Sequence, residues 1–342
     1  MTEITQMDVS DDRQEVVDDG DFLPESEPIQ FVLTLTEGGE RLDRVIARRL
    51  PAYSRSRIQK WIEQGDVTVN GAVAKPKQVM AGVETVAVVP RLSDEETSFM
   101  PEPVDFPVVY EDNVLLVVDK PAGLVVHPAA GNWHGTLLNG LLHHLPESAS
   151  VPRAGIVHRL DKDTTGLMVV AKTIEAQTDL VRQLQARTVH REYFALVWGE
   201  PAVDGTISAP IGRHPKNRIK MAVSTTGYGR HAVTHFQRLA MGALNGSPVS
   251  LIKCRLETGR THQIRVHMQA IGCPLVGDPL YGKPHLAMVF PRQALHAFRL
   301  GLQHPIRKEA VAWTTPVPDD MAALLERASI TLDEVWYGTD HP

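Results

Sequence analysis

The residues best placed to do chemistry lie in the run His158–Leu167 (HRLDKDTTGL), where Asp161 is flanked by Arg159 and Lys162. The run is rich in Asp, Thr and Gly and leads into a short apolar segment, which predicts a loop followed by a strand. Nearby cations favour the ionised form of a carboxylate. We therefore expect this loop to present Asp161 as a nucleophile or a general base.

Composition describes an ordinary globular chain of 342 residues with room for about two domains. The formal charge of -6 is misleading, because the first thirty residues hold ten acidic side chains and one arginine. The remainder carries a net charge of +3, which leaves a nucleic-acid partner open. The acidic segment is low in aromatic residues and has no periodicity, so we expect residues 1–30 to form a disordered tail.

Several classes of protein are disfavoured. Two cysteines, Cys254 and Cys273, without a CxxC pair indicate neither a disulfide framework nor a structural zinc site. No apolar run approaches the ~20 residues of a membrane helix, and a signal peptide is not recognisable, so a cytoplasmic protein is expected. Residues 277–283 fit the start of a phosphate-binding loop, but Pro284 stands where Ser or Thr should hold Mg²⁺, so we expect no nucleotide cofactor.

The elements before residue 90 predict a basic helix pair. Apolar spacing indicates one helix from Glu40 that Pro51 ends, and Ser54 is a suitable N-cap for a second helix through about Gly65, before a strand at 66–71. Residues 38–90 hold nine Lys or Arg against five Asp or Glu, which fits either a phosphate-binding surface or a solvated charged face. The candidate RNA contacts are Arg41, Arg44, Arg48, Arg55, Arg57 and Lys60.

This segment, ERLDRVIARRLPAYSRSRIQKWIEQGDVTVNG, resembles an S4 RNA-binding domain. The resemblance implies that two helices and a hairpin present a basic surface to structured RNA. Five later segments, in order, are similar to pseudouridine synthases of the RluA type. They are Asp119–Pro128, His158–Leu167, Arg191–Gly199, Thr258–His267 and Gly277–Gly282.

The resemblances and the composition together divide the chain. Strand patterns at 167–171, 192–198, 231–238 and 249–256, with few helices and no regular βαβ alternation, favour an α+β fold. We expect a mixed, largely antiparallel sheet in the catalytic domain and a small α/β S4 domain in front. The expected boundaries are 1–30 for the acidic tail, 31–92 for the S4-like domain, 93–107 for a linker, 108–327 for the catalytic domain and 328–342 for a C-terminal tail.

The resemblance implies roles for three residues. Asp161 would be the catalytic carboxylate, and residue chemistry leaves open whether it attacks uracil C6, attacks ribose C1′ or removes a ribose proton. Arg265 would pair with it, although a helix-surface arginine is the simpler reading of its position. Tyr193 would stack on the uracil, and simple packing is its alternative. The isomerisation needs neither a cofactor nor a metal ion, so none is expected.

Further basic residues are candidate RNA contacts. Arg159 would fill the gap left by a flipped-out uridine, and Arg260 would bind phosphate. A basic run similar to that of the RluD-like subgroup, which acts on large-subunit (23S) ribosomal RNA, adds four more, with a solvated loop as the alternative. These four are Arg213, Lys216, Arg218 and Lys220.

The sequence thus predicts an enzyme, an RNA pseudouridine synthase that isomerises uridine in large-subunit ribosomal RNA. The expected partner is ribosomal RNA in pre-ribosomal particles, and the protein is expected to be a monomer with no membrane contact. Two alternatives stay open: a non-catalytic RNA-binding ribosome assembly factor, and an N-glycosidase that hydrolyses the nucleoside instead of isomerising it.

Overall fold

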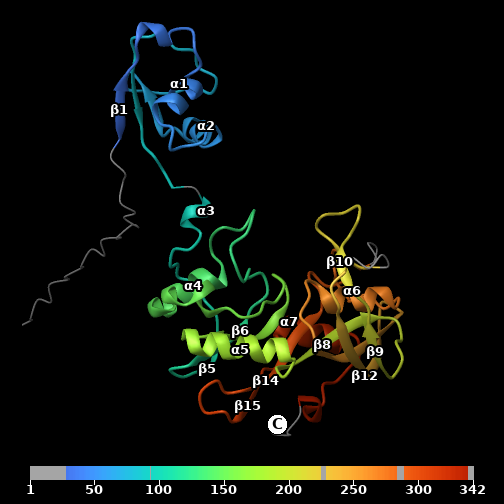
Figure 1. Cartoon of the computed structure of the whole chain (residues 1–342). Coiled ribbons are helices and arrows are strands. Elements are labelled where there is room, and N and C mark those ends of the chain that lie inside the picture. The colour runs from blue at the N-terminus through green and yellow to red at the C-terminus, as the bar shows by residue number, and fades with distance from the viewer. Residues whose placement is uncertain (1–27, 93, 225–228, 283–288, 338–342) are drawn as a thin grey trace, which may run out of the picture. The chain divides into compact units, whose positions relative to one another are not determined.

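The computed structural model describes residues 28–92, 94–224, 229–282 and 289–337, and Figure 1 labels its elements. The chain divides into two compact units, with the division after position 93. None of the helices in the described ranges is long and apolar enough to cross a membrane. Most of the expected acidic tail, residues 1–27, lies outside the described part of the chain.

The first unit packs two helices against a small antiparallel sheet with the strand order β1-β4-β2-β3. Its elements are β1 (Ile29–Val32), α1 (Leu42–Arg49), α2 (Arg55–Gln64), β2 (Val67–Val69), β3 (Ala72–Val73) and β4 (Thr85–Val88), with a 3-10 helix at Leu35–Glu37. The predicted helix pair is confirmed. Ser54 caps α2 by accepting the Arg57 N–H, and Gly65 ends the helix in a left-handed conformation. Ile46, Ile58 and Trp61 are buried between the elements.

The second unit is built on a nine-stranded mixed sheet in the order β5-β6-β7-β14-β8-β13-β12-β9, with β15 paired to β14. The strands are β5 (Val108–Glu111), β6 (Leu115–Lys120), β7 (Thr165–Ala171), β8 (His190–Trp198), β9 (Asp204–Ser208), β12 (Val233–Leu244), β13 (Ser247–Leu256), β14 (Leu295–Gln303) and β15 (Ala310–Thr314). Strands β7 and β14 are parallel, and the other neighbours run antiparallel. The expected α+β class with a largely antiparallel sheet is confirmed.

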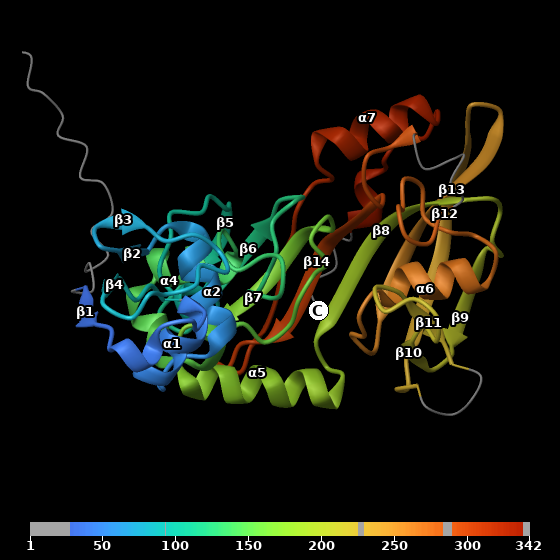
Figure 2. The ribbon, with the colours of Figure 1, turned by 90° about the horizontal axis from the view of Figure 1, so that it is seen from above.

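Helices cover both faces of this sheet (Figure 2). In the described residues of this unit the helices are α3 (Asp94–Thr97), α4 (Leu137–His144), α5 (Ile174–Ala186), α6 (Gln263–Ala270) and α7 (Asp319–Arg327), with 3-10 helices at Pro146–Ser150, Pro152–Gly155 and Glu334–Tyr337. Of these, α4, α5, α6 and α7 pack on the sheet. Along β8, Tyr193 packs with residues of α6, whereas Phe194 packs with residues of α7. Because successive strand residues point to opposite faces, Tyr193 lies on the α6 side of the sheet.

The segments expected as a linker, 93–107, and as a C-terminal tail, 328–342, contain residues that pack on the second unit. Ser98 is buried, and its carbonyl accepts a hydrogen bond from Asn139 of α4. Ile330 is buried beyond α7, and the ring of Tyr337 packs edge-on against Phe298. A Pro-rich, acidic composition marks a boundary in sequence, but it does not tell whether the segment is bound to the neighbouring fold.

Candidate active site

The loop that carries Asp161 precedes β7 and borders a cavity. The Thr164 N–H donates to the Asp161 carbonyl at 3.1 Å, which closes a tight turn, and the Asp161 side chain is 18% exposed. Just after the turn, Gly166 has φ of 113°, and a Cβ there would lie 2.2 Å from the Ala297 carbonyl oxygen of β14. Glycine at position 166 is therefore what allows β7 to approach β14 so closely.

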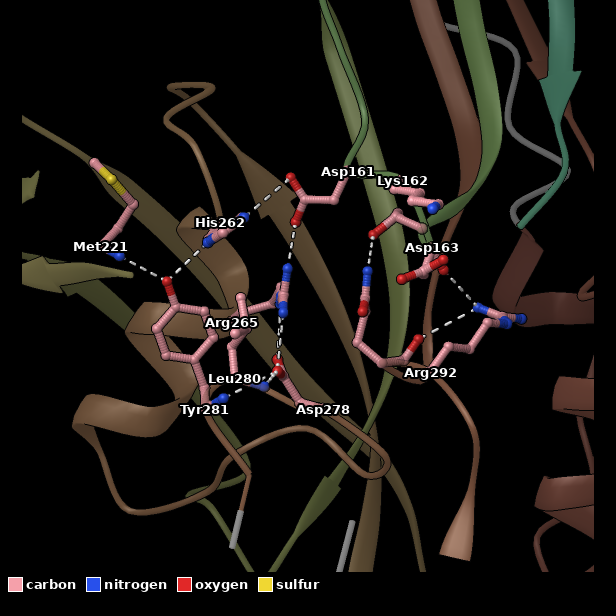
Figure 3. Close-up of polar contacts among 12 residues, drawn as sticks. Asp161, Lys162, Asp163, Met221, His262, Arg265, Asp278, Leu280, Tyr281 and Arg292 are labelled. Atoms are coloured by element: carbon pink, nitrogen blue, oxygen red, sulfur yellow. Dashed lines mark hydrogen bonds and ion pairs between the residues drawn. The ribbon is translucent and has the colours of Figure 1, made fainter. Parts of the chain in front are cut away.

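Arg265 joins Asp161 to a second carboxylate. Its Nη1 donates to Asp161 Oδ2 at 2.9 Å, while Nε and Nη2 donate to the two oxygens of Asp278 at 2.7 and 2.9 Å (Figure 3). Burial works against the charge of Arg265, but the two carboxylates raise its pKa above the usual range. Arg265 is 4% exposed, so the reading of a helix-surface arginine is wrong. The arrangement fixes one oxygen of Asp161 and leaves the other toward His262.

Tyr193 lies in the same small cavity as Asp161 and Arg265. This cavity of about 80 Å³ is also lined by Leu256 and Ile264. Burial raises the pKa of Tyr193 above its ordinary value. A phenol with a raised pKa is a poor base near neutral pH, so the geometry favours a ring that contacts a base over a hydroxyl that removes a proton.

Two hydrogen bonds connect the β10–β11 hairpin (Ile211–Arg213 and Met221–Val223) to His262, which lies beside Asp161. The Met221 N–H donates to Tyr281 Oη at 2.8 Å, and Tyr281 Oη lies 2.8 Å from His262 Nδ1. His262 Nε2 is 4.0 Å from Asp161 Oδ1. Burial lowers the pKa of His262, and the same cause raises the pKa of Tyr281. At neutral pH both groups are therefore uncharged.

Three buried side chains hold the backbone and side chains of the loop after Asp161. Lys120 Nζ donates to the carbonyls of Pro121, Leu124 and Lys162 at 2.7 to 2.9 Å. Arg292 Nη1 donates to the Asp163 carbonyl, and Gln293 Nε2 donates to Thr164 Oγ1. Lys120 is fully buried, and this burial lowers its pKa to about 7. The loop is thus tied to β6 and to the segment before β14.

His158 holds the opposite end of the loop. Its Nε2 accepts a hydrogen bond from the Val169 N–H of β7 at 3.0 Å. Burial lowers the pKa of His158 to about 3, so the ring stays neutral and can accept this bond. With Lys120 on the other side, the turn at Asp161 is fixed both before and after the carboxylate.

A larger cleft of about 1060 Å³ opens beside the cavity. Arg159 is exposed and lines both spaces, and Arg260 also lines both. Arg153 also lines the cleft, and it is the first of three successive residues with positive φ. The third, Gly155, could not accept a side chain. Several positively charged side chains therefore line the cleft that opens beside the cavity.

The other basic candidates lie elsewhere. Arg213, Lys216 and Arg218 are exposed on the β10–β11 hairpin, and Lys220 lies 5.9 Å from the centre of the Tyr281 ring. This hairpin does not line the cleft beside Asp161, but the N–H of Met221, at the start of β11, donates to Tyr281. The hairpin is thus connected to the site through Tyr281, and Arg213, Lys216 and Arg218 line neither the cleft nor the small cavity.

In the first unit, most of the basic candidates bind neighbouring groups of the protein. Arg41 and Arg55 donate to the buried carboxylate of Asp43. Arg48 binds Glu37 and Glu40, and Arg57 donates to the Arg91 carbonyl. Arg44 is exposed on α1, and Lys60 lies on α2. The charge count alone did not reveal these internal partners.

Sequence reasoning assigned no role to Lys120, Asp278, Tyr281, Arg292 or Gln293. Three of them lie in the segments that carry the family resemblance, which is the signal that could have directed attention to them. In the described ranges no three His, Cys, Asp or Glu side chains are grouped as metal ligands. Lys283 and Pro284, on which the exclusion of a nucleotide site was argued, lie outside the described residues.

Comparisons with known proteins agree with both parts of the chain. A family model described as RNA pseudouridylate synthase matches residues 114–270, and one described as S4 domain matches residues 40–79. "Ribosomal large subunit pseudouridine synthase D" of Nitrosomonas europaea is 54% identical over 295 residues, which cover 84% of each chain. The protein of the same name from Neisseria meningitidis serogroup B is 49% identical and covers 96% of this chain and 93% of its own length.

A solved structure gives the same fold. "Human RNA Pseudouridylate Synthase Domain Containing 1" aligns with a TM-score of 0.53 and 30% identity, covering 67% of this chain and 86% of that one. A second human structure, "Human RNA Pseudouridylate Synthase Domain Containing 4", has a TM-score of 0.52 at 24% identity, which bears on the fold alone.

Proposed function

The chain belongs to the RNA pseudouridine synthase family, and on that premise we propose that it converts uridine to pseudouridine in large-subunit ribosomal RNA. The observation that carries the proposal is the Asp161 carboxylate, held by the buried Arg265 in one cavity with Tyr193. The names of the similar proteins support the substrate class.

The proposed chemistry uses groups of this chain. Asp161 attacks uracil C6 or ribose C1′, or removes a ribose proton, and each route breaks the N1–C1′ bond, lets the uracil turn and forms a C5–C1′ bond. The C5 proton is then lost to water and N1 gains a proton, so the reaction balances without a cofactor. Arg265 keeps the carboxylate oriented through a charge-assisted hydrogen bond. Tyr193 provides a ring surface for the uracil. A uridine stacked within an RNA helix cannot enter the small cavity that Asp161 lines, so the target nucleotide must flip out of the RNA helix.

RNA binding in this proposal involves both units. Arg159 fills the gap that the flipped-out uridine leaves in the RNA, and Arg260 binds a phosphate group of the RNA. The hairpin residues Arg213, Lys216, Arg218 and Lys220, together with the S4-like unit at 31–92, bind other parts of the RNA. The protein acts on pre-ribosomal particles in the cytoplasm as a monomer.

Release of tritium from unmodified large-subunit ribosomal RNA labelled at uracil C5 tests the proposal. The wild-type protein should release label and form pseudouridine at defined positions. The Asp161→Asn protein should bind the RNA with unchanged affinity and release none. Label release by the Asp161→Asn protein would remove Asp161 from the mechanism, and free uracil in the wild-type reaction would identify a glycosidase instead.

A further inference from the structure

His262 is the residue just before α6, and it lies beside Asp161 in a strained conformation. Its φ is 57°, in the left-handed region that residues with a Cβ rarely adopt. Its side chain is 16% exposed and lines the small cavity together with Asp161 and Tyr193. Such backbone strain persists where the surrounding structure holds it, often at functional sites.

Tyr281 determines how His262 can use its two nitrogens. Tyr281 is 4% exposed, and its oxygen accepts the N–H of Met221. The hydroxyl hydrogen still needs an acceptor, because buried polar groups are almost always hydrogen-bonded. His262 Nδ1 lies 2.8 Å from Tyr281 Oη and provides that acceptor (Figure 3).

A neutral imidazole carries one proton, so an accepting Nδ1 places that proton on Nε2. Burial favours the neutral ring by lowering the pKa of His262; Arg265 and Arg159 act in the same direction, and Asp161 and Asp278 act against it. Nε2 is 4.0 Å from Asp161 Oδ1, which is too far for a hydrogen bond. The Nε2–H group is therefore available to an atom of the substrate.

The three routes open to Asp161 share one need. Addition at C6 moves the C5=C6 electron pair onto O4 of the uracil. Displacement at C1′, or loss of a ribose proton with elimination, leaves the glycosidic electron pair on the uracil ring, where it spreads over the carbonyl oxygens. Each route therefore builds negative charge on a uracil carbonyl, and a fixed donor there stabilises the transition state more than the substrate.

We propose that His262 is a further catalytic residue, which donates its Nε2–H to a uracil carbonyl oxygen as that negative charge develops. Tyr281 is its positioning residue, because its hydroxyl fixes the tautomer. No proton is transferred, and His262 ends the reaction as it began. The inference rests on the proposed function, since it concerns the same uracil and the same cavity.

Two substitutions separate this role from a structural one. In His262→Asn the amide oxygen can still accept from Tyr281, and asparagine tolerates the left-handed backbone, but no donor reaches the position of Nε2. In His262→Gln the amide nitrogen can take the position of Nε2, while the contact with Tyr281 is lost and the backbone strain stays. A donor role therefore predicts that Gln outperforms Asn, and a loop-holding role predicts the reverse.

Single-turnover tritium release at saturating enzyme measures the two variants, with the wild type and Asp161→Asn alongside. His262→Asn should slow the reaction about 100-fold with an unchanged RNA dissociation constant, as expected for loss of one transition-state donor. His262→Gln should stay within about 10-fold of the wild type. A rate for Asn equal to or above that for Gln overturns the assignment.

The control proteins distinguish this failure from failure of the proposed function. A wild-type protein that releases no label contradicts the function itself, whereas an active wild type with the wrong order of variants contradicts only the role of His262. Should the Gln protein not fold, nitrogen NMR of labelled histidine decides the matter. The signal that disappears in His262→Asn must show a protonated Nε2, and a protonated Nδ1 overturns the proposal.

Discussion

Arginine and carboxylate pair in both units of the chain, but the buried partner differs. In the second unit Arg265 is 4% exposed, and the Asp161 carboxylate that it binds is 18% exposed. In the first unit the Asp43 carboxylate is 2% exposed, while Arg41 and Arg55 are 34% and 43% exposed. The arginine is therefore the more deeply buried partner in the second unit, whereas the carboxylate is the more deeply buried partner in the first.

The two pairs leave opposite charges accessible to a partner. A buried cation that is also fixed by Asp278 holds Asp161 at the wall of a cavity, where one carboxylate oxygen remains open to a substrate. A buried carboxylate that binds Arg55 and Gln59 instead joins α1 to α2 and leaves guanidinium surface exposed. The first arrangement leaves an anion accessible at the cavity, and the second leaves cations accessible at the surface.

Removal of Arg265 should have the largest effect, because it leaves the buried carboxylate of Asp278 without its partner. We expect Arg265→Met to lower the free energy of unfolding by about 3–5 kcal/mol. The rate of tritium release should fall at least about 10³-fold, since Asp161 loses its orientation. Chemical denaturation and single-turnover assays measure the two effects. An unchanged free energy of unfolding would contradict the expectation that a buried carboxylate left without its arginine destabilises the protein.

Lys120 extends the comparison to a buried cation that binds carbonyl groups. Lys120→Met keeps the volume of the side chain but leaves three carbonyl oxygens without their donor, including that of Lys162 in the loop that carries Asp161. We expect the reaction to slow about 100-fold, as for a displaced catalytic group. RNA affinity should not change. Weaker RNA binding at an unchanged rate, seen in a filter-binding assay, would instead make Lys120 part of the RNA surface.

Asp43→Ala in the first unit should cost less, because water can solvate the exposed Arg41 and Arg55 that it leaves behind. We expect a loss of about 1–3 kcal/mol in the stability of this unit, measured by hydrogen exchange in α1 and α2. Burial opposes ionisation, but Gln59, Arg55 and Arg41 lower the pKa of Asp43 from 3.8 to about 2.

This pKa gives the effect a sign in pH. Because the unfolded chain protonates Asp43 first, the stabilisation is present above about pH 4 and is lost as the pH falls toward about 2. Asp43→Ala should lack this part of the acid sensitivity. A variant that loses stability with the same pH dependence as the wild type would show that Asp43 acts by packing rather than by charge.

Arg44 should give the smallest effect, confined to RNA. It is exposed on α1, so Arg44→Ala should leave stability unchanged and reduce the slope of log affinity against log salt by about 1. Arg55→Ala is the matched control, because it removes a cation and also a partner of Asp43. Equal salt slopes for Arg44→Ala and the wild type would make this side of α1 a solvated face.

Local signals explain what could be predicted from the sequence. The loop of Asp161 is contiguous and rich in turn residues, and the helix that Ser54 caps shows both its cap and its glycine end. The contacts that complete each site join distant residues. Asp43 binds Arg55 across the turn between α1 and α2, and Arg265 forms a buried ion pair with Asp278. In neither case does the spacing along the sequence follow a helix or strand repeat that could have predicted the contact.

Strand β14 was not predicted for a physical reason. Eight of its nine residues are at least partly buried, so the strand does not show the apolar and polar alternation of a half-exposed one. The burial of Lys120 could not be predicted for a related reason, because lysine is almost never fully buried unless its charge has partners. Both cases depend on what surrounds the residue in space, which a single sequence does not display.

Strand β14 also determines when, during its own synthesis, this chain can become an enzyme. The ribosome delivers the chain from its amino terminus, so β7 emerges early and β8 and β13 follow. Asp161 precedes β7 and Arg265 follows β13, and β14 is the strand that joins these two parts of the sheet. The two parts of the sheet can therefore join only after Gln303 has left the ribosome, and we expect the nascent protein to be inactive until then.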